Sequence, residues 1–348
     1  MNPYVLTILM FGLILGTTIT ASSSHWLLAW MGLEINTLAI IPLMAQTHHP
    51  RAIEATTKYF LTQATAAATL LFASVTNAWL TGQWDITLMT HPVPTAMITL
   101  ALALKLGLAP LHTWLPEVLQ GLTLTTGLIL STWQKLAPFI LLLQIPCPSQ
   151  ELLIMLGLTS TLVGGWGGLN QTQLRKILAY SSIAHLGWML LIIQFAPSLT
   201  LLALLAYLVM TTATFLTLKN NKATNINALA TSWPKAPLLT AATPLLLLSL
   251  GGLPPMTGFL PKWLILQELT KQQLPTTAVL AALTALLSLY FYLRLSYAMT
   301  LTISPNNLAG TSLWRLTVVN PSLLLATSTL TATLLLPLSP AIVALTGL

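Results

Sequence analysis

Long apolar stretches separated by short polar ones run through the chain from end to end. A helix needs about 20 apolar residues to cross a membrane. The apolar runs are continuous rather than alternating, which argues against a β-barrel. We therefore expect an all-α polytopic membrane protein. The pattern predicts eleven spanning helices, at 3–21, 24–45, 55–80, 94–119, 123–145, 151–170, 176–195, 199–218, 236–271, 275–300 and 320–345.

The composition supports a membrane protein. The chain has 348 residues, of which 55% are hydrophobic and only 5% are charged. A soluble domain carries about 25% charged residues, so most of this surface cannot face water. The first apolar stretch has no basic leader and no clear cleavage site, and we interpret it as a retained span rather than a signal peptide. The net charge of +7 indicates basic loops on one side of a membrane, and we expect no nucleic-acid partner.

The basic residues of the loops fall almost entirely on one side of the predicted topology. With the N-terminal side taken as inside, the outside loops carry Lys271 alone. This asymmetry follows the positive-inside rule, so we expect the N-terminus inside and the C-terminus outside. The inside loops carry nine basic residues: Arg51, Lys58, Arg175, Lys176, Lys219, Lys222, Lys235, Arg294 and Arg315.

Two of the predicted spans contain the same interrupted motif. "GLAPLHTWLPEVLQ", from Gly107, aligns without gaps to "GLPPMTGFLPKWLI", from Gly252, at an offset of 145 residues. Proline removes a backbone donor and clashes with the preceding turn. The backbone groups freed in this way cannot face lipid. We therefore expect a discontinuous helix near 107–110 and another near 251–255.

The two copies lie in the fourth and ninth predicted spans, an odd number of spans apart. The two units that contain them must therefore point in opposite directions, which is typical of transporters built from inverted repeats. The predicted organisation is a first five-helix repeat over 1–145, a second over 151–300 and a C-terminal transmembrane helix over 320–348.

Four charged residues fall near the middle of predicted spans: Glu34, Lys105, Lys135 and Lys262. A charge at the bilayer centre costs about 2.5–3.5 kcal/mol on the insertion scale. Snorkelling to the headgroups is the simpler explanation for a lysine near a helix end, but about ten apolar residues flank Lys105 and Lys135 on each side. Burial disfavours the charged form of a lysine. These four residues are therefore candidates for a path that takes up and releases protons, with Glu34 as the partner of a lysine.

Histidines add two candidate relay sites. His112 follows the first break, and His185 lies midway along the seventh span. A membrane histidine equally often only bonds a neighbouring helix, so both readings stay open. Glu117 aligns with Lys262 in the repeat but is expected near the inside surface. The segment "GGWGG" around Trp166 indicates close helix packing rather than a site.

Motifs for nucleotide binding are missing from the sequence. It has no Gly-Lys-Ser/Thr loop and no G-x-G-x-x-G fingerprint. The sequence thus predicts a chain that moves charge and takes its energy from an ion gradient or from a partner protein.

Specific sequence strings link the chain to a known family. "ALKLGLAPLHTWLPEVLQG", "GGLPPMTGFLPKW", "WMGLEINTLAIIPL" and "GGLNQTQLRKILAYSSIAHLGW" resemble the antiporter-like subunits of respiratory complex I, in the animal mitochondrial form. That form lacks the first three of fourteen helices, which suits a count of eleven. The resemblance implies a proton channel in which Glu34 acts with Lys105, Lys135 links the halves and Lys262 serves the second half.

The resemblance also implies a location and partners. The chain is then expected in the mitochondrial inner membrane with the matrix inside, beside neighbouring antiporter-like subunits and membrane lipids. No cofactor or metal is expected in this chain, because the NADH, FMN, iron–sulfur clusters and ubiquinone of the whole complex belong to other chains.

Two functions from different classes remain open at this point. One is a proton-translocating subunit driven by a redox partner. The other is a self-contained secondary cation/proton antiporter, which the fold alone would permit. A structural membrane spacer is a third reading, and the central lysines argue against it.

Overall fold

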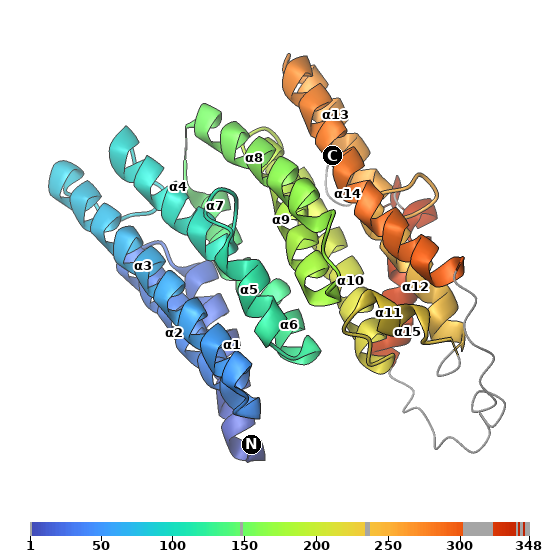
Figure 1. The fold of residues 1–348 in the computed structure, drawn as a ribbon. Helices are drawn as coiled ribbons and strands as arrows, with labels where there is room; N and C mark the ends of the chain where they lie inside the picture. Colours follow the sequence, from blue (N-terminus) through green and yellow to red (C-terminus); the bar gives the residue numbers. More distant parts are fainter. Residues whose placement is uncertain are drawn as a thin grey trace. The chain divides into compact units, whose positions relative to one another are not determined.

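The computed structural model describes residues 2–146, 149–233, 237–301, 323–338, 340–341 and 344. The basic residues Lys235 and Arg315 lie outside the described residues, as do both ends of the predicted span 320–345. In the described part of the chain all regular elements are helical, which confirms the all-α prediction (Figure 1).

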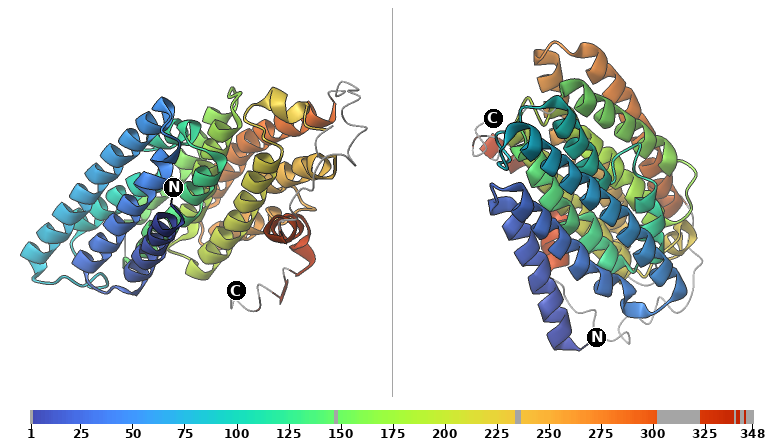
Figure 2. Two further views of the ribbon diagram at one scale, coloured as in Figure 1. Left: turned by 90° about the horizontal axis from the view of Figure 1, so that it is seen from below. Right: turned by 90° about the vertical axis from the view of Figure 1, so that its left-hand side faces the viewer.

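The chain divides into two compact units, Met1–Ser160 and Thr161–Leu348, here called unit 1 and unit 2. The helices of unit 1 run alongside one another (Figure 2). Unit 1 contains α1 (Pro3–Ser22), α2 (Trp26–Met44), η1 (Ala45–Thr47), α3 (Pro50–Thr81), α4 (Pro92–Leu106), α5 (Trp114–Gly121), α6 (Leu124–Ser131), α7 (Trp133–Gln144) and the start of α8 (Gln150–Gly168). Unit 2 contains the rest of α8, α9 (Leu174–Ile192), α10 (Pro197–Asn220), α11 (Ile226–Ala230), α12 (Pro237–Gly251), α13 (Phe259–Lys271), α14 (Pro275–Thr300), α15 (Leu323–Leu334) and η4 (Leu336–Leu338).

Helices long and apolar enough to cross a membrane account for much of the described chain. Six stretches meet both conditions: α1, α2, α3, the stretch Leu124–Gln144 formed by α6 and α7, α10 and α14. The helices α4, α12 and α15 are apolar but shorter. Each predicted span overlaps at least one of the described helices, so the multi-spanning character is confirmed, whereas the count of eleven crossings stays a prediction.

Helices α4 and α12 both end within the repeated motif, and the local geometry of the two ends is the same. Helices α4 and α12 each have 15 residues, and each ends at a glycine in the left-handed conformation, Gly107 with φ 77° and Gly252 with φ 78°. The Gly107 amide donates to the carbonyls of Ala103 and Leu104, and the Leu108 amide also donates to Ala103. The amides of Gly252 and Leu253 make the same three bonds 145 residues later, to Leu248 and Ser249.

Such glycine caps satisfy the last carbonyls of a helix whose end is not in water. They let each helix end with its last carbonyls paired, which a membrane protein requires wherever the chain is away from water. The inverted relation between the two repeats, and their boundaries at 1–145 and 151–300, stay predictions.

A further discontinuity went unpredicted. The expected single span 123–145 consists of α6 and α7, which meet at Thr132 with φ −112° and ψ −71°. Pro138 lies inside α7, where it removes a donor and crowds the carbonyl four residues earlier. This irregular stretch places Lys135 in the first turn of α7.

The glycines around Trp166 confirm the prediction of close helix packing. A Cβ added at Gly164 would lie 2.7 Å from the Ala184 backbone nitrogen of α9, and one at Gly165 would lie 2.8 Å from the Leu287 Cβ of α14. Trp166 itself is exposed. Exposed large apolar side chains are common over both units, as expected for a lipid-facing surface.

Candidate functional site

A small cavity in unit 1 brings several candidate residues together. It offers about 20 Å³ to the centres of water molecules, where about 10–15 Å³ is enough for one. Helices α2, α3, α4, α5, α6 and α7 form its walls. The lining residues are Leu33, Asn36, Thr37, Tyr59, Gln63, Lys105, Leu106, Trp114, Leu115, Leu130, Gln134, Lys135, Ala137 and Pro138.

Lys105 reaches this cavity from the last turn of α4. The residue is only 7% exposed. Its Nζ has no hydrogen-bond partner among the described residues. The carbonyl end of a helix attracts a cation, and the glycine cap stops α4 at Leu106, one residue beyond Lys105. The break therefore leaves the lysine at the negative end of a half-helix, inside the protein.

Lys135 lines the same cavity from α7 and is 2% exposed. The sequence placed both lysines at mid-span but could not show that they face one space. A snorkelling lysine would extend to the surface, and neither of these two does.

Glu34 lies beside the cavity rather than in its lining. Its carboxylate accepts a hydrogen bond from the Thr37 hydroxyl at 3.1 Å. None of the ion pairs within 4.0 Å among the described residues includes Glu34. The structure shows no direct ion pair between Glu34 and Lys105, so the expected partnership stays a prediction.

Three amides complete the polar lining and were missed from the sequence. Asn36 and Gln63 are 2% and 4% exposed. Gln134 donates from Nε2 to the Asn36 carbonyl at 3.3 Å, which joins α7 to α2. The candidates predicted from the sequence are all charged or histidine side chains. An uncharged amide within an apolar span carries the same signal, because it too is costly to bury without a partner.

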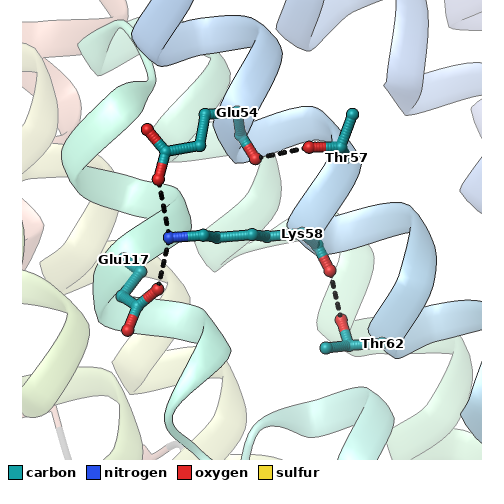
Figure 3. Close-up of polar contacts among 5 residues, drawn as sticks. All are labelled: Glu54, Thr57, Lys58, Thr62 and Glu117. Atoms are coloured by element: carbon teal, nitrogen blue, oxygen red, sulfur yellow. Dashed lines mark hydrogen bonds and ion pairs between the residues drawn. The ribbon is translucent and has the colours of Figure 1, made fainter.

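Glu117 has a different setting from the cavity residues. It is exposed on α5, and its carboxylate lies 2.8 Å from Lys58 Nζ. Lys58 also contacts Glu54 at 2.7 Å, so one ammonium lies between two carboxylates and joins α3 to α5 (Figure 3). Exposed ion pairs stabilise little. This group of three charges is therefore a surface feature beside the broken helix.

Lys262 occupies the corresponding region of unit 2, at the second break. Its Nζ donates to the Gly251 carbonyl at 2.8 Å, from the first turns of α13 back to the last residue of α12. In the first break the Trp114 indole donates to the Leu104 carbonyl at 3.1 Å. Each broken helix therefore has a side-chain donor on its carbonyl end. In unit 1 the donor is neutral and the lysine is separate, whereas in unit 2 the lysine itself is the donor.

The two candidate histidines lie in separate surroundings. His112 is half-buried in the turn between α4 and α5. His185 lies on α9 with its ring centroid 5.6 Å from that of Tyr207 on α10. Tyr207 is fully buried. Neither histidine lines the cavity of unit 1.

No group of three or more histidine, cysteine or acidic side chains that could hold a metal ion occurs among the described residues. The expectation that this chain carries no cofactor stays a prediction.

Comparisons with known proteins place the chain in a family. Residues 23–288 match the family described as NADH:quinone oxidoreductase/Mrp antiporter, TM, and residues 289–343 match NADH dehydrogenase subunit 2 C-terminus. The chain is 73% identical over 345 residues to NADH-ubiquinone oxidoreductase chain 2 of Tetraodon nigroviridis, with 99% of each chain covered. The chain belongs to the NADH-ubiquinone oxidoreductase chain 2 family. The resemblance inferred from the sequence is thus confirmed.

Other relatives of the chain 2 family agree. Chain 2 of Oncorhynchus mykiss is 70% identical over 349 residues, with 100% of both chains covered. A chain in the structure of respiratory complex I from Thermus thermophilus with bound aureothin is 30% identical, with a TM-score of 0.82. That match covers 97% of this chain and 80% of the other. A chain of the Mrp complex from Dietzia sp. DQ12-45-1b shares the fold, with 18% sequence identity and a TM-score of 0.80. That match covers 96% of this chain and 75% of the Mrp chain.

Proposed function

We propose that this chain translocates protons across the mitochondrial inner membrane as a multi-pass subunit of respiratory complex I. Electron transfer from NADH to ubiquinone in other subunits supplies the energy. The observation that carries the proposal is a pair of lysines, Lys105 and Lys135, buried on the same cavity beside a broken helix. Membership of the NADH-ubiquinone oxidoreductase chain 2 family supports the assignment to complex I.

Buried lysines suit proton transfer for a physical reason. Burial disfavours the ammonium, while a carboxylate within electrostatic range favours it. A lysine under both influences can gain or lose its proton when the nearby charge or hydration changes. In this proposal Glu34 sets the charge state of Lys105, and Lys135 exchanges protons with Lys105 through the cavity. A buried lysine with no part in such a path would be only a cost to stability.

Lys262 is the proposed proton-carrying residue of unit 2. Its amine lies on the carbonyl end of α12, where the helix dipole favours a positive charge. His112 and His185 are proposed as relays near the first break and beside Tyr207, because a histidine exchanges protons near neutral pH.

The proposal places the N-terminus on the matrix side and the C-terminus on the intermembrane-space side, from the positive-inside rule. It includes neighbouring antiporter-like subunits and lipids as partners, and no cofactor in this chain.

A self-contained cation/proton antiporter was the other function open from the sequence. The likeness to the Mrp complex shows the fold alone, and the relatives at 66–73% identity are chain 2 proteins of NADH-ubiquinone oxidoreductase. The subunit function is therefore favoured.

The test compares substitutions of two candidate charged residues of unit 1 with the substitution of an exposed lysine of the same unit. We expect Lys105→Met and Glu34→Gln to lower proton pumping per NADH oxidised in vesicles that contain the assembled complex. The matched control is Lys58→Met, which removes an exposed lysine of the same unit and should leave pumping unchanged. If the first two variants assemble and pump as well as the native complex, the proposed path through unit 1 is wrong.

A further inference from the structure

We infer that Thr257 is a positioning residue for Lys262, and that the helix α15 holds the second break in place through the hydroxyl of this threonine. The inference rests on the proposed function, because the position of Lys262 matters to pumping only if this lysine carries protons. It gives a task to α15, which lies outside both predicted repeats.

The hydroxyl of Thr257 joins two separate elements of unit 2. It donates a hydrogen bond to the Ala332 carbonyl of α15 at 2.6 Å, across 75 residues of sequence. Most threonine hydroxyls in the described helices donate instead to a carbonyl three or four residues earlier in the same helix, as Thr331 does to Thr327 and Ser328. Thr257 is 7% exposed and Ala332 is fully buried, so little water competes for this bond.

The Ala332 carbonyl needs a donor from outside its own helix. Helix α15 ends at Leu334, so Ala332 belongs to its last turn. The last four carbonyls of a helix have no partner within that helix, and a buried carbonyl left unpaired is costly. The threonine hydroxyl therefore completes the buried end of α15 while it fixes the turn from which it comes.

That turn joins α12 to α13 and sets the position of Lys262. Gly258, the next residue, packs so closely on α12 that a Cβ there would overlap the Ser249 carbonyl oxygen. The turn is thus held by α12 at Gly258 and by α15 at Thr257. Lys262 follows in the first turns of α13, and its Nζ reaches back to the Gly251 carbonyl at 2.8 Å. A shift of the turn would lengthen this contact.

An apolar cavity beside the turn leaves room for such a shift. It offers about 190 Å³ to the centres of molecules of the size of water, and Thr257, Leu260 and Pro261 line it together with residues of α10 and α15. Helix α15 packs against α10 and α12, and among the described residues no comparable packing joins it to α13. The hydrogen bond of Thr257 is therefore the main restraint that α15 places on the start of α13.

The bond connects two parts of the chain that match different families. Thr257 lies within 23–288, which matches the antiporter family, and Ala332 lies within 289–343, which matches the subunit 2 C-terminus. The first break has a weaker tie. There Thr159 of α8 donates to the Ala109 carbonyl at 3.3 Å, and its hydroxyl lies closer to the Met155 carbonyl of its own helix, at 2.8 Å. The stronger tie thus occurs at the break where a lysine bonds the carbonyl end of the half-helix.

The experiment compares three variants in the assembled complex, reconstituted into vesicles. Thr257→Val keeps the shape of the side chain and removes the hydroxyl. Thr257→Ser keeps the hydroxyl and removes the methyl group. The matched control is Thr331→Val, the same change at a threonine that lines the same cavity but bonds its own helix. Protons pumped per NADH are measured for each, together with Lys262→Met, and a density map of each complex shows where Lys262 lies.

We expect Thr257→Val to lower the ratio of placed to displaced Lys262 about fivefold, the equilibrium equivalent of one net hydrogen bond. Placed means that the amine lies within hydrogen-bond distance of the Gly251 carbonyl. Pumping should fall in Thr257→Val and stay close to native in Thr257→Ser and Thr331→Val. A purely packing role predicts the opposite order for the two variants of Thr257, since valine keeps the volume and serine leaves a gap.

A native position of Lys262 in Thr257→Val, or an equal displacement in Thr331→Val, would overturn the inference. The outcome for Lys262→Met separates it from the proposed function. Loss of pumping in Lys262→Met with native pumping in Thr257→Val rejects the positioning role alone. Native pumping in Lys262→Met removes this lysine from the proposed path, while the map of Thr257→Val still shows whether the threonine holds it.

Discussion

The substitution Gly252→Ala tests whether the second break positions Lys262. Gly252 has φ 78°, a conformation that favours glycine. A Cβ at this position would lie 2.9 Å from both Cδ and Nζ of Lys262. The lysine side chain is flexible enough to move away, but in moving it must leave the Gly251 carbonyl that it contacts at 2.8 Å.

The expected cost has two parts. A non-glycine residue in the left-handed region costs about 1–2 kcal/mol. Loss of a hydrogen bond to a charged group costs about 1.5–3 kcal/mol. Together they predict a destabilisation of about 2.5–5 kcal/mol. In the Lys262→Ala background only the backbone part remains, so the coupling between the two sites should be about 1.5–3 kcal/mol.

Gly251→Ala is the matched control one residue earlier. Its added Cβ would lie 3.6 Å from the nearest atom, Tyr292 Cδ2, which is ordinary contact. Alanine is also a better helix former than glycine by about 1 kcal/mol. We expect this variant to match or slightly exceed the native stability and to pump normally.

The assay is the thermal midpoint for loss of assembled complex, measured for the native chain, the three single variants and the double variant. Proton pumping is measured on the same samples, and we expect it to fall in Gly252→Ala. If Gly252→Ala costs the same with and without Lys262, or is as mild as Gly251→Ala, then the glycine does not hold the lysine in place.

Two further predictions concern the relay and the repeats. Lys135→Arg should lose most pumping in assembled complex because arginine stays protonated, whereas Lys135→His, with an ordinary pKa near 6.5, should retain more. The measurement is proton uptake per assembled complex, and full pumping by the arginine variant would show that a permanent charge suffices. The segments Gly107–Pro116 and Gly252–Pro261 should superpose, together with their five-helix repeats, after a rotation about an axis in the membrane plane. An experimental structure of the assembled complex would test this, and repeats related by an axis along the membrane normal would contradict the prediction.

The sequence determined the class of the protein and the positions of its main elements. Lipid offers no hydrogen bonds, so the lipid-facing parts of each spanning segment must be helical and apolar. This constraint is local, and it can be read along the chain without knowledge of the packing. The two breaks were predictable for the same reason, because glycine and proline act on their own turn of backbone. Helices α4 and α12 end where the repeat predicts.

Only the tertiary structure decided which side chains lie close to one another. Whether Lys105 and Lys135 face one cavity depends on how α4 and α7 are rotated about their axes, and many weak packing contacts fix that rotation. The same holds for the amides of Asn36 and Gln63, which look like ordinary polar residues in the sequence. The reach of Lys262 back to Gly251 and the pairing of Glu117 with Lys58 also arise across turns or between helices. Hydropathy along a chain indicates which segments lie in the membrane. The direction in which a side chain points is set by the helices that pack around it.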